Sequence, residues 1–136
     1  MNYKAHITIG TLTGVGVSIA AYRYQYHLSP VLITVPAMIG SVLPDIDHPK
    51  SYLGRRLPFI SKPLFHTFGH RTITHSLLFL CIITASLMKT NTSVGIGIFF
   101  GILSHLLADM LTPFSKGVAL FYPVRKRFGL FMAKSK

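Results

Sequence analysis

The chain has 136 residues, of which 50% are hydrophobic and 12% are charged, and its mean hydropathy is +0.50. A soluble domain contains about 25% charged residues, so this composition is typical of a protein that lies in a bilayer. The length predicts a single domain, residues 1–136, with no second core. The net charge of +11 is compatible with a nucleic-acid partner or an anionic membrane surface. The single cysteine, Cys81, excludes an intramolecular disulfide.

Four apolar segments follow one another along the chain, at residues 5–22, 30–43, 73–88 and 93–111. A transmembrane helix needs about 20 residues, so the first and fourth segments are long enough and the third is marginal. The second is short and contains two prolines, which favour a kink. The pattern predicts an all-α, polytopic helical membrane bundle of about four transmembrane helices. A soluble basic helical protein is the alternative.

Lysine and arginine are distributed unevenly between the connections. The links after the first and third segments hold one each, Arg23 and Lys89. The other twelve fall at the N-terminus, in the central loop and in the tail: Lys4, Lys50, Arg55, Arg56, Lys62, Arg71, Lys116, Arg125, Lys126, Arg127, Lys134 and Lys136. The positive-inside bias therefore predicts a multi-pass protein of the cell (inner) membrane with both termini in the cytoplasm. The charge is then accounted for by topology and anionic lipid headgroups, and no nucleic-acid partner is expected.

The central loop, residues 44–72, shows no helical period and mixes aromatic and aliphatic residues with five basic ones. This mixture predicts a long interfacial loop that lies among the lipid headgroups. Ordinary packing against the helix ends is the alternative. The tail, residues 114–131, repeats the mixture and is also expected to touch the membrane surface.

The acidic residues are unusually few, and each lies close to a histidine. Asp45, Asp47 and Asp109 are the only three in the chain. On the predicted topology they meet five histidines at the cytoplasmic ends of the segments. Carboxylates and imidazoles gathered in this way favour a metal site or acid–base chemistry. The eight candidates are His6, Asp45, Asp47, His48, His70, His75, His105 and Asp109.

Two stripes at four-residue spacing place some of these candidates on helix faces. Residues four apart share a face, and small residues let helices approach closely in lipid. Each stripe therefore predicts a tightly packed half and a half that carries ligands toward the bundle interior. The stripes are His6, Gly10, Gly14 and Ser18 in the first segment, and Gly97, Gly101, His105 and Asp109 in the fourth.

The donor types indicate a divalent metal, one or two ions. Imidazole and carboxylate without thiolate suit Zn²⁺, Mn²⁺ or Fe²⁺, of which Zn²⁺ is favoured. The predicted ligands are His6, Asp45, Asp47, His70, His75, His105 and Asp109. A two-ion centre suits phosphate-ester hydrolysis. Asp47, His48 and Arg71 are then the catalytic candidates, with Asp47 as a possible bridge and a histidine off the metal protonating the leaving group.

Each residue also has a structural interpretation. Asp45 and Asp47 could cap turns, His6 and His70 could bond to backbone, and Arg71 could extend toward the membrane surface.

Four blocks of sequence carry a resemblance to a known family. They are His6, Leu-Pro-Asp-Ile-Asp-His-Pro at residues 43–49, His-Arg-Thr-Ile-Thr-His-Ser at residues 70–76, and the stretch from Ser104-His105 through Asp109 to Thr-Pro at residues 112–113. Over nearly its full length the chain resembles the bacterial membrane-bound metal-dependent hydrolases, the YdjM-like inner-membrane proteins. Thr72 stands where that family usually has glycine. The resemblance implies a polytopic membrane protein and a hydrolase distantly similar to zinc-dependent phospholipase C.

These observations predict a membrane-bound metal-dependent hydrolase that acts at the cytoplasmic interface on a phosphate ester of a lipid. Membrane lipids are the expected partners, and Arg55, Arg56 and Arg71 are the expected substrate-binding residues. The alternative is a non-catalytic membrane protein whose metal ion is structural or transported.

Overall fold

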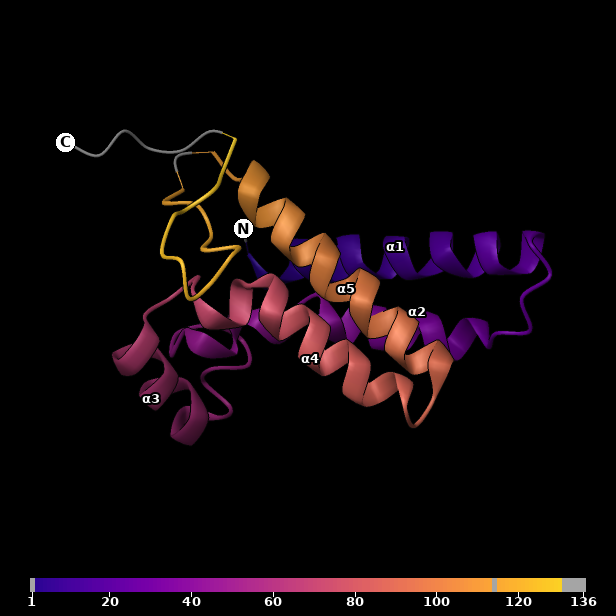
Figure 1. Ribbon diagram of the computed structural model, residues 1–136, viewed down its shortest axis with the longest axis horizontal. Helices are drawn as coiled ribbons and strands as arrows, with labels where there is room; N and C mark the ends of the chain where they lie inside the picture. Colours follow the sequence, from indigo (N-terminus) through magenta and orange to yellow (C-terminus); the bar gives the residue numbers. More distant parts are fainter. Residues whose placement is uncertain (1, 114, 131–136) are drawn as a thin grey trace.

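The computed structural model describes residues 2–113 and 115–130. Over these residues the chain is helical, with no named strand, and Val118 and Phe128 form an isolated β-bridge (Figure 1). The prediction of an all-α bundle is confirmed. The α-helices and the two 3₁₀ helices are α1 (Tyr3–Arg23), α2 (Pro30–Gly40), η1 (Leu43–Asp47), α3 (Pro58–Phe68), η2 (Ile73–His75), α4 (Leu77–Met88) and α5 (Thr92–Leu111).

The four apolar helices each begin at a polar capping residue. The side-chain oxygens of Asn2, Ser29, Ser76 and Asn91 each accept a hydrogen bond from the backbone N–H three residues later, at 3.0 to 3.4 Å. Such a cap satisfies one of the N–H groups that the first turn leaves without a helical partner. The starts of α1, α2, α4 and α5 are therefore set by local sequence.

Three stretches are long and apolar enough to cross a membrane: α1, the segment Pro30–Asp47 that contains α2 and η1, and α5. The fourth apolar helix, α4, has 12 residues, which corresponds to about 18 Å of helix. That is shorter than a hydrocarbon core of about 30 Å. The third predicted segment is thus divided between η2 and a short α4.

Close backbone contact holds α2 against both α1 and α5, which also contact each other. A Cβ atom on Gly101 or Gly97 would overlap the carbonyl oxygen of Ala37 or of Ile33 on α2. On the other side, a Cβ on Gly14 would lie 2.8 Å from the Cα atom of Thr34. Glycine is therefore required at these positions, and all the residues of the two predicted stripes are buried.

The outer faces of these helices remain apolar. Leu12, Ile19, Val31 and Leu107 are each more than half exposed, whereas the helix interfaces bury Ile33 and Ile102 completely. An apolar exterior around a packed interior is what a lipid environment allows. The arrangement supports location in a membrane.

The central loop, whose sequence shows no helical period, contains the helix α3. Pro58 begins this helix at its first turn, where a missing N–H costs nothing. Tertiary contact then supports it: Ser61 is completely buried against the turn at Gly54. Only this residue of α3 is buried, so Phe59 and most of its neighbours are exposed.

The described part of the tail packs back over the bundle end that carries α3, η1 and η2 (Figure 1). Ala119 N–H donates to the carbonyl oxygen of Arg71 at 3.0 Å, and Leu77 N–H donates to that of Leu120 at 2.9 Å. Lys134 and Lys136 lie outside the described residues. Contact of the tail and the central loop with the membrane surface stays a prediction.

The glycine contacts give a first test. We expect Gly97→Ala to destabilise the bundle by about 1–3 kcal/mol, because its new methyl group has to displace the backbone of α2. Gly16→Ala is the matched control, since a Cβ at Gly16 meets nothing within 4 Å. Thermal unfolding of the two variants in detergent measures the difference. Equal stability of both would contradict backbone contact between α5 and α2.

Candidate metal centre

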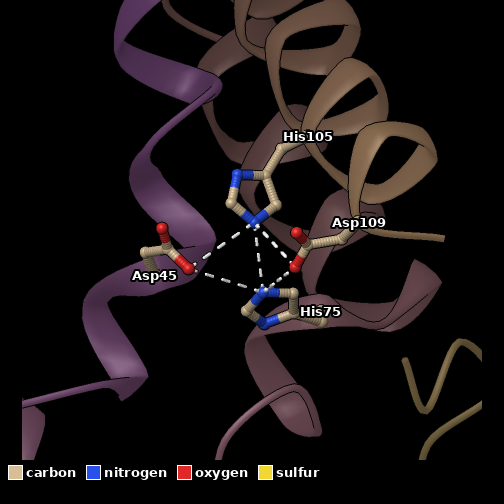
Figure 2. A group of neighbouring side chains, drawn as sticks. All are labelled: Asp45, His75, His105 and Asp109. Atoms are coloured by element: carbon tan, nitrogen blue, oxygen red, sulfur yellow. Dashed lines mark hydrogen bonds and ion pairs between the residues drawn. The ribbon is translucent and has the colours of Figure 1, made fainter. Parts of the chain in front are cut away.

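Four side chains from three elements converge at one end of the bundle. Asp45 comes from η1, His75 from η2, and His105 and Asp109 from the end of α5 (Figure 2). One donor atom from each lies within 4.8 Å of the other three. Asp45 is 18% exposed, whereas the other three side chains are at most 1% exposed.

The spacing of the donor atoms fits a four-coordinate ion. The Nε2 atoms of His75 and His105 are 3.1 Å apart, and Asp109 Oδ2 lies 3.4 and 3.6 Å from them. Asp45 Oδ1 lies 3.8 and 3.7 Å from the same two nitrogens. Tetrahedral ligands at about 2.0 Å from zinc would be about 3.3 Å from each other. The arrangement can therefore close around a small divalent ion with modest movement.

The hydrogen bonds of His105 turn its metal-binding nitrogen toward the centre. His105 Nδ1 lies 2.7 Å from the carbonyl oxygen of Ser41, which can only accept, so Nδ1 carries the proton. The neutral ring then presents a bare lone pair at Nε2. This tautomer follows from the hydrogen-bond network, and the same outer contact is typical of histidines that bind metals.

His75 is oriented in the same way by a carboxylate and a hydroxyl group. Its Nδ1 lies 3.3 Å from Asp47 Oδ2 and 3.1 Å from Thr74 Oγ1, and its Nε2 faces His105. If both rings carry their proton at Nδ1, the two Nε2 atoms present lone pairs 3.1 Å apart, and a cation between them would offset their repulsion. The donor set therefore fits a metal ion on grounds of geometry and chemistry.

Asp47 lies beside this set and is saturated by donors from the protein. Its Oδ1 accepts from His70 Nδ1 at 2.7 Å. Its Oδ2 accepts from the Arg71 backbone N–H at 3.0 Å and from Thr74 Oγ1 at 2.7 Å. The completely buried Asp47 thus ties the loop of residues 70–75 to η1. Thr74 was absent from the predicted site, although it lies within the motif at residues 70–76.

His6 and Arg71 contact Oδ1 of Asp109, the oxygen that faces away from His75 and His105. Arg71 Nη2 donates to Asp109 Oδ1 at 2.9 Å, and His6 Nε2 lies 3.5 Å from the same oxygen. The His6 ring also stacks on His105, with centroids 4.0 Å apart and planes 22° apart. Arg71 therefore contacts the four-donor set through Asp109, and His6 contacts it through Asp109 and His105.

A cavity of about 310 Å³ adjoins the centre at Asp45. Basic and aromatic side chains form much of its wall, including His48, Lys50, Tyr52, Arg55 and His70. The pKa of His48 is lowered by burial and then by the nearby His70, so its neutral Nδ1 accepts from the Lys50 N–H at 3.2 Å. A proton on the ring is consequently held at Nε2. Lys50 and Tyr52 were not predicted as site residues.

The three predicted substrate-binding arginines occupy different surroundings. Arg55 is exposed and lines the cavity. Arg56 lies over the Tyr52 ring, 3.8 Å from its centroid. Arg71 is 14% exposed and engaged with Asp109.

The fold and the site define a helical membrane protein with a His/Asp group at one end that could hold a metal ion. Comparison with known proteins agrees with this class. The sequence model of the YdjM inner membrane protein family matches residues 1–136, and the chain belongs to this family.

Curated relatives of the chain are found in Escherichia coli, Shigella flexneri and Bacillus subtilis. The chain is 44% identical to the inner membrane protein YdjM of Escherichia coli K12 over 84% of its length, and equally to that of Shigella flexneri. It is 37% identical to the uncharacterised protein YvsG of Bacillus subtilis over 97% of its length, which covers 81% of that protein. The chain spans 64% of the length of the two YdjM proteins. No solved structure matches it.

The donor set predicts that binding of a metal ion requires His105. We expect His105→Ala to weaken Zn²⁺ binding by more than the roughly 10–100-fold typical of losing an outer contact, because Nε2 of His105 faces the ion directly. His27→Ala is the matched control, since it removes an exposed imidazole in the link after α1. Elemental analysis of detergent-purified protein, with zinc titration, measures both. Equal metal content in the two variants would exclude this centre.

Proposed function

We propose that the protein is a membrane-bound metal-dependent hydrolase that acts at the cytoplasmic membrane interface on a phosphate ester of a lipid. One observation carries this proposal: the His/Asp centre adjoins, at Asp45, a cavity whose wall includes Lys50 and Arg55. Metal ligands next to a basic cavity suit an anionic ester, because the cations hold the phosphate while the scissile bond lies near the ion.

A bound divalent ion would supply Lewis acidity and a water of lowered pKa. The chain's own residues account for the other parts of the reaction. Lys50 and Arg55 would bind the ester oxygens. Asp47 would hold His75 and His70 in place through the contacts described above. His48 lines the cavity, where the Nε2–H of its neutral ring can donate a hydrogen bond to the leaving oxygen.

The position of the centre supports a lipid as the substrate. It lies where α1 begins and α5 ends, at the bundle end that also holds α3 (Figure 1). A cavity of about 310 Å³ is at the lower limit for small-molecule sites. A phosphorylated headgroup fits this volume while the acyl chains stay in the bilayer. With the headgroup in the cavity and the acyl chains in the bilayer, the lipid would enter the site laterally from the membrane.

The orientation is part of the proposal: a multi-pass protein with both termini and α3 in the cytoplasm. Its support is the distribution of twelve basic residues against two between the connections. Substrate headgroups would then come from the inner leaflet.

A structural metal ion is the second candidate, and the burial of the centre favours it. Four protein donors complete a tetrahedral shell, whereas catalytic zinc sites keep one position open for water. Three of the four side chains are at most 1% exposed. Under this reading the ion would fasten η1, η2 and α5 together, and the cavity would have no catalytic role.

An assay on reconstituted protein separates the two candidates. We expect the metal-loaded protein in lipid nanodiscs to release phosphate or headgroup from a panel of phosphatidic acid and phosphodiester lipids. Arg55→Gln should raise KM about 10-fold, the value of one hydrogen bond to a charged group, and leave metal content unchanged. Arg23→Gln, at the last residue of α1, is the control. Full metal loading without turnover on any lipid would favour the structural ion.

The topology has its own test, for which the single cysteine is convenient. In a Cys81→Ser background, a membrane-impermeant maleimide should label Gln25→Cys in intact cells, because the link after α1 faces outward in the proposed orientation. Lys62→Cys on α3 should be labelled only after permeabilisation. Both positions are exposed on the protein surface. The reverse pattern would invert the orientation and place the centre outside.

A further inference from the structure

The two carboxylate oxygens of Asp109 face different groups. Oδ2 faces the imidazoles of His75 and His105 at 3.4 and 3.6 Å. Oδ1 receives the Arg71 guanidinium group at 2.9 Å. In two-metal centres the ions are about 3.5–4 Å apart, and a carboxylate that bridges them places one oxygen on each. Here the permanently charged guanidinium group occupies the position that a second ion would take.

Over the described residues, Asp45, His75, His105 and Asp109 are the one group of three or more donors close enough to hold an ion, and the other candidates make contacts of their own. Both oxygens of Asp47 accept hydrogen bonds from protein donors. One of those donors is His70 Nδ1, and His48 Nδ1 accepts from the Lys50 N–H. His6 Nε2 is directed to the oxygen that Arg71 already holds.

The backbone fixes Arg71 in this position. Its φ of 60° is in the left-handed region, which is strained for a residue other than glycine. Hydrogen bonds hold it from both sides: its N–H donates to Asp47 Oδ2, and its carbonyl oxygen accepts from the Ala119 N–H, each at 3.0 Å. A strained conformation held by a buried carboxylate and by the tail indicates a constrained role for this side chain.

The charges balance with one ion and not with two. The chain has three acidic residues in all, and every one lies in or beside this centre. One divalent ion together with Arg71 already offsets their charge of −3 when the imidazoles are neutral, and Lys50 and Arg55 add positive charge beside Asp45. A second divalent ion would leave an excess of +2 in a largely buried site, and buried charge without compensation is strongly unfavourable.

We propose that the centre binds one divalent ion per chain and that Arg71 is the fixed second cation, a positioning residue that keeps Asp109 Oδ2 directed at the ion. This inference rests on the proposed metal-binding function and narrows it to a single-ion centre. Arg71 acts through Asp109 and does not bind the ion.

The test is a titration of metal-free, detergent-solubilised protein with Co²⁺, read by the visible absorption of the bound ion, and with Zn²⁺, read by calorimetry. We expect the wild-type protein to saturate at one equivalent. Arg71→Gln should keep this stoichiometry but bind about 10–100-fold more weakly, as the loss of an outer contact to a ligand does. Arg71→Lys should recover part of the affinity, because it restores the charge without the planar fork.

Controls separate this inference from the broader one. Arg23→Gln should bind like the wild type, and circular dichroism should show equal helix content in every variant. Saturation of the wild type at two equivalents would overturn the single-ion centre while leaving metal binding intact. Unchanged affinity in Arg71→Gln would overturn the role of Arg71. No binding to the wild type would overturn the metal centre itself.

Discussion

The structure depends on the neutralisation of buried charge at one end of the bundle. Asp47 and Asp109 are almost completely buried, and an ionised carboxylate removed from water is tolerated only when it is paired and hydrogen-bonded. Asp47 meets this condition through protein donors alone. Asp109 meets it on one oxygen through Arg71, while its other oxygen and Asp45 face two imidazole nitrogens whose protons are directed elsewhere. In the proposed metal centre, a divalent cation between these four donors would add to this compensation.

Packing inside the bundle delivers the ligands to this point. Gly101 of α5 lies directly on Ala37 of α2, and one turn further along both helices His105 meets the carbonyl oxygen of Ser41. On α1, Gly10 lies against Ser41, and His6 stacks on His105 one turn before it. The glycine contacts therefore fix the registers of three helices, and the registers determine which donors meet. A shift of one residue in either contact would rotate the histidines away from the centre.

Regular periodicity made the helices and the stripes predictable from sequence. The apolar segments, their polar caps and the four-residue spacing of His6, Gly10, His105 and Gly101 are local patterns that the fold preserves. Three features depended on contacts that no local pattern encodes. The helix α3 is supported by its contact with η1 and by burial of Ser61 against the turn at Gly54, and the left-handed Arg71 is held by Asp47 and by the tail.

The third feature is the division of labour among the acids. Asp45 and Asp47 are two residues apart in one motif, and nothing in the sequence distinguishes their roles. In the 3₁₀ turn they point to different surroundings, so that Asp45 joins the four-donor set and Asp47 meets the donors of residues 70–75. Sequence spacing could identify both as candidates. Only the tertiary placement of the loop of residues 70–75 distinguishes Asp45, a candidate metal ligand, from Asp47, which holds that loop in place.

Asp45 is also the residue on which the role of the proposed metal ion, catalytic or structural, depends. The three other donors are rigid: His105 is fixed by Ser41, His75 by Asp47 and Thr74, and Asp109 by Arg71. Asp45 is held through its backbone, whose carbonyl oxygen accepts from Ser51 Oγ at 2.6 Å, and its carboxylate is the one that adjoins the cavity. A carboxylate on a firm backbone can turn aside without disturbing the other ligands. If an anionic ester bound by Lys50 and Arg55 displaced it, the fourth coordination position would open on the side from which the substrate arrives, and a closed, buried centre would become competent for hydrolysis.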